Sequence, residues 1–371
     1  MKITILQGAF LPVPAKRGGA IEKAWQLLGE EFARMGHEVV HISRHCDGLP
    51  KKEKINDVLH VRVTGADASN NPYILKLKEL AYVLRARKVL PKSDILVTHA
   101  FWAPIIIPRK RFGKIYVHVG RFPKGQLRLY SKAARFQTPS RVVTAAAQAE
   151  LTEKDERART LPYPLPFSFP DDLNYYQKHS KKVLYAGRIH PEKGILNLLK
   201  AWEKIPSEFK NEWSLRIIGP WEESQGGGGE SFFREVKKRA GESVEIDGPI
   251  FLESDLIKQY KEAELFVYPS FAKKGETFGL AILEAMSFGC VPIVSSLPCF
   301  KDFIKPSENG FCFDENSGQC DEELAMCLLD LMSKSSLSIY ADRAVKTAKN
   351  FSVEKIAKLY IEDFASLLEE E

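Results

Sequence analysis

One pattern constrains the fold of this chain more than any other: strand-to-helix alternation runs twice, on either side of a proline-rich stretch. Residues 161–170 (LPYPLPFSFP) hold four prolines in ten positions, and proline disfavours both helix interiors and central strands. Before this stretch, 2–8 and 39–43 are predicted strands that flank a helix beginning after Gly19. After it, the alternation restarts with a strand at 182–186. The sequence therefore predicts two α/β domains, each built around a parallel sheet.

Short apolar runs between turn signals predict the remaining strands. They lie at 95–99, 115–119 and 141–145 in the first half, and at 214–218, 244–247, 263–269 and 291–295 in the second. Helices are predicted at 195–205, at 278–288 and from about residue 321. The glycine run 226–229 directly follows no strand, which favours a flexible loop over a phosphate cradle. We expect domains at 1–165 and 175–350, with a C-terminal helix at 351–371 that packs back toward the first.

Charge is divided unevenly between the two halves. The chain has 371 residues and a net charge of +6, but residues 1–165 hold 29 Lys and Arg against 14 Asp and Glu, and the rest hold 25 against 34. A basic first half predicts an anionic partner, such as a phosphate-bearing substrate, a membrane surface or nucleic acid. An uneven but solvated surface is the alternative. Because no nucleic-acid reader motif is present, we expect no nucleic-acid partner.

The sequence shows no secretory or membrane-spanning signal. Its first ten residues, MKITILQGAF, lack a cationic segment followed by an apolar one, and no stretch reaches the roughly 18 apolar residues of a spanning helix. We therefore expect a cytoplasmic protein, with peripheral contact at the inner face of the cytoplasmic membrane left open. The six cysteines form no CxxC pair, so we assign them no chemistry.

Two glutamates bracket the most informative segment of the second half. The segment ETFGLAILE, from Glu276 to Glu284, lies between two predicted strands, so its loop is expected at the ligand-binding edge of the sheet. The amides of Phe278, Gly279 and Leu280 would begin a helix and face an anion. Eight helical residues span about 12 Å, more than the roughly 5 to 9.5 Å between glycosidase carboxylates. The spacing thus favours two grips on one extended ligand; a first-turn acid and a surface glutamate are the alternative.

A second motif places two cations at the same edge. In YAGRIHPEKG, Arg188 and Lys193 follow a predicted strand and precede a helix. Together they would neutralise a diphosphate, which arginine can bind bidentately. Solvated turn charges are the alternative.

These two motifs, in this order and about 90 residues apart, resemble those of the family-4 retaining glycosyltransferases (glycosyl transferases group 1). The resemblance covers nearly the whole chain. It implies the GT-B fold: two Rossmann-like, doubly wound parallel-sheet domains that face each other across an interdomain cleft. It also implies donor contacts: Arg188 and Lys193 at the diphosphate, Glu276 at hydroxyls of the donor sugar, Glu284 at the ribose, and the amides of Phe278, Gly279 and Leu280 at the phosphate.

In the first domain, the resemblance implies that a glycine loop, Gly18-Gly19, closes over the donor. Glycines before a helix N-terminus also let backbone approach an anion. The family carries a histidine at the end of a central strand, which His118 matches and which we pair with Glu276 as the catalytic residues. His99 ends the preceding predicted strand and is the second candidate. A structural hydrogen-bonding role is the alternative for either histidine.

Two departures from the family pattern concern the end of the first domain. Where many members carry Asn-Gly-Val-Asp, this chain has Tyr163-Pro-Leu-Pro166. At the end of the predicted strand 141–145, where the family carries a serine, this chain has Ala145. The donor motifs themselves match, so we expect an active enzyme.

The predicted reaction moves a sugar from a nucleotide-diphosphate sugar to a hydroxyl of a glycan, lipid-linked or small-molecule acceptor, with retention of configuration. No Asp-x-Asp motif ends a strand, so we expect no metal ion and no cofactor beyond the UDP- or GDP-sugar donor. Arg188, Lys193 and a helix dipole would stabilise the leaving diphosphate instead. A nucleotide-sugar epimerase or a soluble disaccharide synthase of the same fold is the alternative; a non-catalytic nucleic-acid-binding protein is a remote one.

Candidate acceptor contacts lie in the basic first half. Aromatic and basic residues follow the two histidine-bearing strands and would suit a sugar ring with an anionic group: Phe101, Trp102, Arg121, Phe122, Lys124 and Arg128. Residues 73–92 form a predicted helix with Leu77, Leu80, Ala81 and Leu84 on one face and many lysines and arginines beside it. This helix would either lie on an anionic bilayer or pack on the sheet with its cations solvated.

Overall fold

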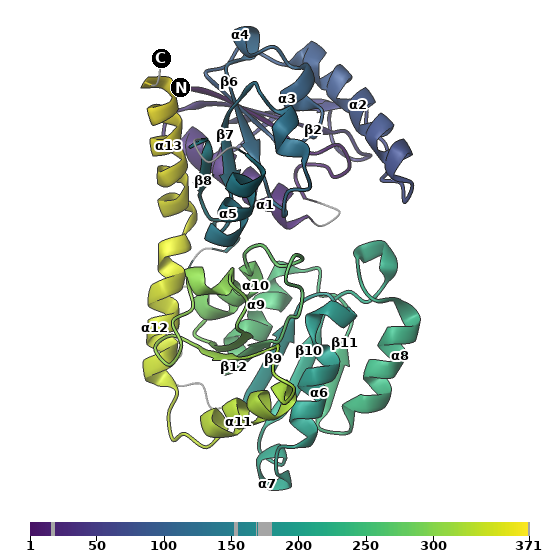
Figure 1. Ribbon diagram of the computed structural model, residues 1–371, viewed down its shortest axis with the longest axis vertical. Helices are drawn as coiled ribbons and strands as arrows, with labels where there is room; N and C mark the ends of the chain where they lie inside the picture. Colours follow the sequence, from purple (N-terminus) through teal and green to yellow (C-terminus); the bar gives the residue numbers. More distant parts are fainter. Residues whose placement is uncertain (16–18, 152–154, 168, 170–179, 370–371) are drawn as a thin grey trace. The chain divides into compact units, whose positions relative to one another are not determined.

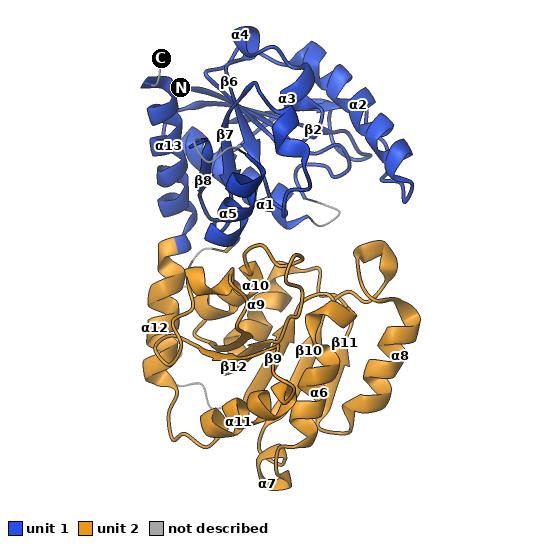
Figure 2. Cartoon of the chain, viewed as in Figure 1, with its two compact units in different colours: residues 1–166, 351–371 blue, residues 167–350 orange. Residues whose placement is uncertain are grey.

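The computed structural model describes residues 1–15, 19–151, 155–167, 169 and 180–369. The chain forms two compact units, one of residues 1–166 with 351–371 and the other of residues 167–350 (Figures 1 and 2). Residues 168 and 170–179, which include the end of the proline-rich stretch, and Gly18 of the predicted glycine loop lie outside the described residues.

The first unit is built on an eight-stranded sheet. Its strand order is β3-β4-β2-β1-β5-β6-β7-β8, and every pairing except that of β3 with β4 is parallel. The strands are β1 (Lys2–Leu6), β2 (Glu38–Arg44), β3 (Lys52–Ile55), β4 (Val58–Val63), β5 (Ile95–Thr98), β6 (Lys114–His118), β7 (Ala133–Thr138) and β8 (Ala158–Thr160).

Helices cover both faces of this sheet, as expected for a doubly wound fold. One apolar core joins a sheet face to α1 (Ala20–Arg34) and α13 (Val353–Glu369). A second core joins the opposite face to the remaining helices of the unit. These are α2 (Pro72–Val89), α3 (Ala103–Ile106), α4 (Arg109–Phe112) and α5 (Arg141–Glu150).

The second unit has a six-stranded, all-parallel sheet of order β11-β10-β9-β12-β13-β14. Counted within the unit, this is the 3-2-1-4-5-6 order of a dinucleotide-binding sheet, whose strand order reverses between β9 and β12. The strands are β9 (Lys182–Ala186), β10 (Ser214–Ile218), β11 (Val244–Asp247), β12 (Leu265–Tyr268), β13 (Val291–Ser295) and β14 (Phe311–Phe313). The helices are α6 (Ile195–Glu203), α7 (Ser207–Lys210), α8 (Gly229–Ala240), α9 (Glu253–Glu262), α10 (Leu280–Ser287), α11 (Cys320–Met332) and α12 (Ser338–Ala348).

The strand predicted at 141–145 is wrong, because these residues begin helix α5. The segment buries Val143 and Ala147, four residues apart, which is the spacing of a helix face. The nearby strand is β7, and it is followed by Ser140 at the N-cap of α5. The residues that follow the strand are therefore Pro139 and Ser140. The comparison of Ala145 with the family's serine is wrong, because no strand ends at residue 145.

Helix α2 packs on the sheet through Tyr82, Val83 and Ala86, which lie outside the predicted leucine face. Leu77 and Leu84 are 66% and 45% exposed, whereas Tyr82 and Val83 are buried. Glu79 is also buried, and its carboxylate accepts the backbone N–H of Phe101 at 2.8 Å. The charged residue Glu79 is therefore buried, whereas Leu77 and Leu84 of the same helix face solvent.

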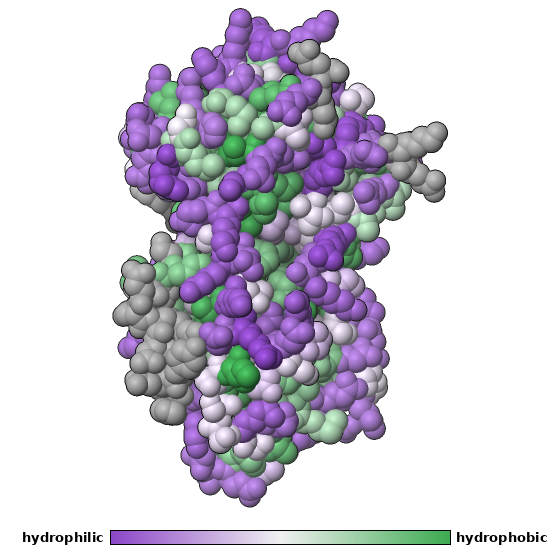
Figure 3. Space-filling view, turned by 90° about the vertical axis from the view of Figure 1, so that its left-hand side faces the viewer, coloured by the Kyte–Doolittle hydropathy of each residue, from purple (hydrophilic) through white to green (hydrophobic). Residues whose placement is uncertain are grey.

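The C-terminal helix α13 belongs to the first unit. Its Phe364 is fully buried, with ring centroids 4.9 Å from Tyr116 and 5.7 Å from Phe32. Asp363 accepts the hydroxyl of Tyr116 at 2.8 Å and pairs with Arg135. Figure 3 shows hydrophilic residues over much of the face of the first unit that carries α13, and the residues that this helix buries are apolar or aromatic. The last helix of the chain thereby completes the core of the first unit.

This packing predicts a stability effect. Replacing Phe364 with Ala should lower the free energy of unfolding of the first unit by about 3 to 5 kcal/mol, because a buried aromatic ring leaves a cavity. Urea unfolding followed by circular dichroism measures the change. The control Leu359→Ala, on the same helix but 44% exposed, should cost less than about 1 kcal/mol. Equal losses in the two variants would contradict the packing described here.

Candidate functional site

A buried ion pair joins the two motifs of the second unit. Lys193 Nζ contacts Glu276 Oε1, and the two residues are only 4% and 7% exposed. The same carboxylate oxygen accepts the hydroxyls of Tyr268 at 3.1 Å and Ser270 at 3.2 Å. A charge buried this deeply needs such partners, because burial removes its hydration. Residues 83 positions apart in sequence are thus brought into one site beside the point where the strand order reverses.

Arg188 lies next to this pair in the turn that follows β9. Its guanidinium donates to Glu192 Oε1 at 2.7 Å and to the carbonyl of Gly226 at 2.6 Å. Its backbone carbonyl accepts the hydroxyl of Tyr185 at 2.8 Å. The guanidinium side chain is 38% exposed, so it is both oriented and accessible to an anion. The glycine run at 226–229 contributes a carbonyl to this orientation and begins helix α8 at Gly229.

Helix α10 begins at Leu280, two residues later than predicted, with Gly279 at the N-cap. Gly279 has φ +97°, and a Cβ atom there would lie 2.8 Å from the ring of Phe300. Both the backbone conformation and the packing therefore require glycine. No side chain caps this helix end, and the first amides of a helix have no partner within it, so a helix N-terminus of this kind suits an anion. Phe278 lies before the helix and is buried.

Glu276 lies outside the helix, so the interpretation of it as a first-turn acid is wrong. It lies in the turn before α10, and its carboxylate forms an ion pair with Lys193. Glu284 lies within α10, where its carboxylate accepts the hydroxyl of Tyr260 at 2.9 Å. The two glutamates therefore have separate surroundings.

Glu284 also lines a cavity of about 200 Å³ at the carboxyl ends of β9 and β10. The lining is otherwise mostly apolar: Ala186, Gly187, Ile218, Gly219, Pro220, Pro249, Ile250, Leu256, Tyr260 and Ala281. An apolar slot with one carboxylate suits a flat ring joined to a group that bears hydroxyls. The cavity, the Lys193–Glu276 pair and the start of α10 all lie at the carboxyl ends of the strands of this sheet.

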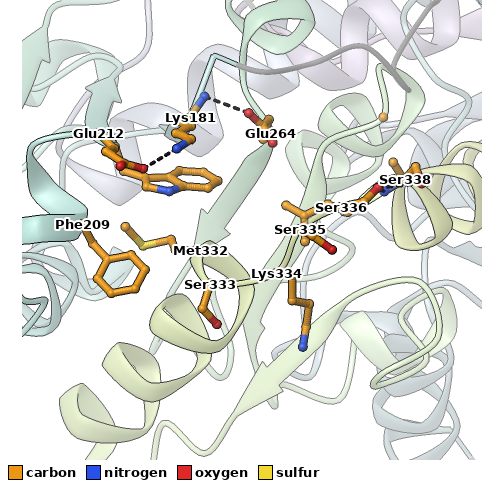
Figure 4. Close-up of a pocket in the computed structure, with 14 residues that line it drawn as sticks. Lys181, Phe209, Glu212, Glu264, Met332, Ser333, Lys334, Ser335, Ser336 and Ser338 are labelled. Carbon is orange, nitrogen blue, oxygen red and sulfur yellow. Dashed lines mark hydrogen bonds and ion pairs between the residues drawn. The ribbon is translucent and has the colours of Figure 1, made fainter.

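A larger cavity, of about 430 Å³, lies at the amino ends of the strands of the same sheet (Figure 4). Lys181 precedes β9 there, bonding through its amide to Glu264 and through its ammonium to Glu212. A serine-rich loop, 333–338, closes the other side. None of the predicted site residues lines this cavity, and ligands of open α/β sheets bind at the carboxyl edge instead.

In the first unit, His118 ends β6 and uses both ring nitrogens. Its Nδ1 contacts Gln137 Oε1, and its Nε2 lies 3.0 Å from the hydroxyl of Tyr163. Burial lowers the pKa of His118 to about 4. The ring is therefore neutral near pH 7 and acts as a hydrogen-bonding group, not as a charge.

His99 stands beside His118, with ring centroids 4.8 Å apart. Its Nδ1 contacts Gln7, and its buried Nε2 has no hydrogen-bond partner among the described residues. Burial, followed by the neighbouring His118, lowers the pKa of His99 well below its usual range. Trp25 of α1 packs on both rings, so the two predicted histidines form one neutral cluster under α1.

The described half of the glycine loop is Gly19, the N-cap residue of α1. Glu22 lies in the first turn, and burial raises the pKa of its carboxyl, while hydrogen bonding to its own backbone amide and the charge of Arg121 oppose this shift. Arg121 itself is exposed and follows β6. The helix N-terminus, Glu22 and Arg121 therefore lie near one another at the carboxyl edge of the first sheet.

Trp102 and Phe122 do not join the histidine cluster. Both pack against the core on the sheet face opposite to α1, and the indole N–H of Trp102 donates to the carbonyl of Lys76 in α2 at 2.9 Å. Of the predicted acceptor-side residues, His99 lies with His118, and Arg121 with Glu22. Trp102 and Phe122 belong to the packing of α2 and the sheet.

Four residues of these clusters escaped the sequence analysis as site residues. Tyr268 ends β12 and Ser270 lies in the turn that follows, and both bond to Glu276. Their position, as hydroxyl-bearing residues at the end of an apolar strand, could have indicated them as site residues. Gln137 was missed because β7 was not predicted. Tyr163 was noted only as a departure from a family pattern, and nothing in the sequence pairs it with His118.

Within the described residues, no group of three or more His, Cys, Asp or Glu side chains could hold a metal ion. All six cysteines are free thiols. Among the described helices, none combines the length and apolar character needed to cross a membrane.

The buried pair yields a stability prediction. Glu276→Ala should cost about 3 to 5 kcal/mol of unfolding free energy, because it leaves the ammonium of Lys193 buried without its counter-charge. A double-mutant cycle of urea unfolding compares Glu276→Gln, Lys193→Met and the double variant. The double variant should regain much of the unfolding free energy that Glu276→Gln alone loses. Glu308→Ala is the control, because the Lys305–Glu308 pair is exposed and should contribute less than about 1 kcal/mol. Additive single effects at 193 and 276 would contradict the coupling.

Known proteins resemble the second unit in sequence. Residues 174–351 match the family described as glycosyl transferases group 1. O-antigen chain mannosyltransferase B of Escherichia coli is 32% identical over 175 residues, which cover 46% of this chain and 42% of that protein. The alignments with the first curated relatives span less than half of those proteins' length.

Solved structures match over the whole chain. Sucrose-phosphate synthase from Thermosynechococcus elongatus superimposes with a TM-score of 0.80 at 19% identity, covering 98% of this chain and 99% of that one. HepE from Anabaena, solved with UDP and glucose, has a TM-score of 0.71 at 16% identity, covering 99% of this chain and 100% of that one. The chain therefore has the GT-B fold, and residues 174–351, in its second unit, match the glycosyl transferases group 1 family.

Proposed function

We propose that this protein is a glycosyltransferase that moves a sugar from a nucleotide-diphosphate sugar to a hydroxyl acceptor, with retention of configuration and without a metal ion. The observation that carries the proposal is the edge of the second sheet. There, an accessible arginine, a buried lysine–glutamate pair, a helix N-terminus and a mostly apolar cavity lie together. Each has a counterpart in a donor: diphosphate, sugar, phosphate and nucleoside.

The roles of individual residues follow from their chemistry. Arg188 and the amides of α10 would bind the diphosphate, and Glu284 would accept hydroxyls of the ribose. Lys193 would bind diphosphate oxygens on the side away from Glu276, whose carboxylate would accept hydroxyls of the donor sugar. Positive groups aimed at the leaving diphosphate stabilise the charge that develops there.

In the proposed step, the bond between the anomeric carbon and the diphosphate oxygen breaks, and the acceptor oxygen bonds to that carbon from the same face. The leaving phosphate oxygen takes the acceptor's proton. No second nucleophile is needed, and atoms and charge balance. His118 and the neighbouring backbone would support the sugar from the first unit.

The comparisons support a sugar-transfer role. O-antigen chain mannosyltransferase B and phosphatidyl-myo-inositol mannosyltransferase are both named for transfer of mannose, and HepE was solved with UDP and glucose. We therefore propose a UDP- or GDP-sugar as donor and a glycan or a lipid-linked molecule as acceptor.

A thermal-shift screen of UDP, GDP, ADP and their sugars tests donor binding. One nucleotide diphosphate should raise the melting temperature, and Arg188→Ala should weaken its binding by 10-fold or more, about 1.4 kcal/mol, because a charge-assisted contact is lost. Arg216→Ala is the matched control: this arginine of β10 pairs with Asp247 and Glu245 and does not line the cavity described above.

Product analysis follows with the bound donor and a panel of acceptors. We expect an α-linked product from an α-linked donor and the same rate with and without EDTA. A new nucleotide sugar formed from donor alone would favour an epimerase instead. Loss of activity with EDTA would contradict the metal-free step.

We further propose that α2 brings the protein to an anionic membrane that carries its acceptor. Exposed apolar side chains, Tyr73 (81%) and Leu77 (66%) among them, alternate on this helix with exposed arginines and lysines. Such a face suits the boundary of an anionic bilayer, where apolar groups enter and cations meet headgroups.

Flotation with liposomes tests this contact. The protein should float with vesicles that contain phosphatidylglycerol and stay behind with pure phosphatidylcholine. The double variant Leu77→Asp/Leu84→Asp should lose flotation, whereas Met326→Asp, at a residue of α11 that is 63% exposed, should keep it. Flotation of the double variant at the wild-type level would contradict the role of α2.

A further inference from the structure

The glycine run 226–229, predicted as a flexible loop, is tied to the protein at every residue. Its four amides donate over 2.8 to 2.9 Å to four backbone carbonyls, which in the order of the glycines are those of Glu223, Glu222, Ile189 and Trp221. An amide that is bonded inside the protein is not available to an anion. The run is therefore not a phosphate cradle, and another role has to explain four glycines in a row.

Steric constraints require glycine in this run. A Cβ atom at residue 227 would lie 2.2 Å from the backbone carbonyl carbon and oxygen of Trp221, and backbone atoms cannot move aside as a flexible side chain can. Gly226 and Gly229 have φ values of +80° and +81°, a conformation that favours glycine. The bond from the amide of Gly229 to the carbonyl of Trp221 closes the segment into a compact loop.

This loop holds the turn that carries Arg188. The next residue, Ile189, donates its amide to the carbonyl of Pro220 at 2.8 Å, and its own carbonyl accepts the amide of Gly228 at 2.8 Å. The carbonyl of Gly226 accepts the guanidinium of Arg188 at 2.6 Å. The backbone of the turn and the side chain of its arginine are therefore bonded to the same loop.

The glycine clamp, as we call residues 220–229, leaves Arg188 partly open to a ligand. The clamp holds the guanidinium at one corner, and Glu192 holds it at another, at 2.7 Å. These contacts use two of the five N–H groups of a guanidinium, and the side chain is 38% exposed. A ligand that has to order a long side chain loses binding free energy in doing so. Here the protein has ordered the arginine beforehand.

We propose that the glycine clamp is a positioning element of the diphosphate site, which holds Arg188 in the orientation in which its remaining N–H groups meet a phosphate. The inference rests on the proposed function, because it concerns the same site. A backbone carbonyl suits this task, since it accepts from the guanidinium but carries no net charge that would repel a phosphate.

The test is a double-mutant cycle of Gly227→Ala and Arg188→Ala in the full-length protein, measured by isothermal titration calorimetry with UDP and with GDP. In the wild-type background, Gly227→Ala should weaken binding of the preferred diphosphate about 3- to 10-fold, the effect of freeing one long side chain. In the Arg188→Ala background, it should weaken binding less than about 2-fold, because the side chain that the clamp holds is gone. A purely structural role of the loop would give equal losses in both backgrounds.

Two other glycines of the second unit provide matched controls. Gly318 is exposed, and a Cβ atom there would meet nothing within 4 Å, so Gly318→Ala should bind the diphosphate as the wild type does. If the melting curve shows that Gly227→Ala does not fold, Gly226→Ala takes its place, because the nearest atoms to a Cβ at 226 belong to the side chain of Arg188, at 3.3 Å. Its control is Gly241→Ala, which has φ +69° and no contact within 4 Å.

The outcomes separate the clamp from the proposed function. If neither UDP nor GDP binds the wild-type protein, the proposed function fails and the role of the clamp fails with it. If Arg188→Ala weakens binding but Gly227→Ala does not, or if Gly227→Ala causes equal losses in both backgrounds, the proposed function stands and the clamp is refuted. Wild-type affinity in Arg188→Ala would overturn the role of this arginine and that of the clamp together.

Discussion

The contact between Lys193 and Glu276 is the interaction on which the rest of the second unit depends. Two opposite charges are almost completely buried, and two hydroxyls complete the hydrogen bonding of the carboxylate. The pair ties the turn after β9 to the turn before α10, so that both loops share one edge of the sheet. The accessible arginine is oriented by its own contacts in the first of these turns, and the second turn leads into the helix N-terminus. A charge pair held this way is costly for stability and informative about function.

The first unit uses the opposite strategy. Its net charge is strongly positive, yet the cluster at the ends of its central strands is neutral. Burial lowers the pKa of both histidines, and glutamine amides hold their rings. The basic residues lie outside this cluster, many of them on α2. In both halves the sign of the net charge differs from that of the cluster. The acidic half carries the cations proposed for the diphosphate, and the basic half carries a neutral cluster of histidines.

Much of this could be predicted from the sequence, for physical reasons that differ between elements. The strand-to-helix alternation and the proline stretch predicted both sheets, because buried parallel strands are continuous apolar runs. The prediction failed at 141–145, where β-branched residues begin a helix that tertiary packing stabilises. At α2 the sequence did not show that Glu79 is buried while Leu77 and Leu84 are exposed. Arg188, Lys193 and Glu276 could be found because turns at strand ends carry charge. Their pairing could not, since it depends on contacts between distant segments. The same holds for Tyr163 and Gln137, which meet at His118 from separate strands and loops.

The central claim is that the edge of the second sheet holds a nucleotide diphosphate. The most direct measurement is isothermal titration calorimetry of the wild-type protein with a nucleoside diphosphate and the matching monophosphate, for the base that binds best. The account predicts that the diphosphate binds at least about 10-fold more tightly, because Arg188, Lys193 and the start of α10 each favour an additional phosphate charge. Equal affinity for the two nucleotides would contradict it.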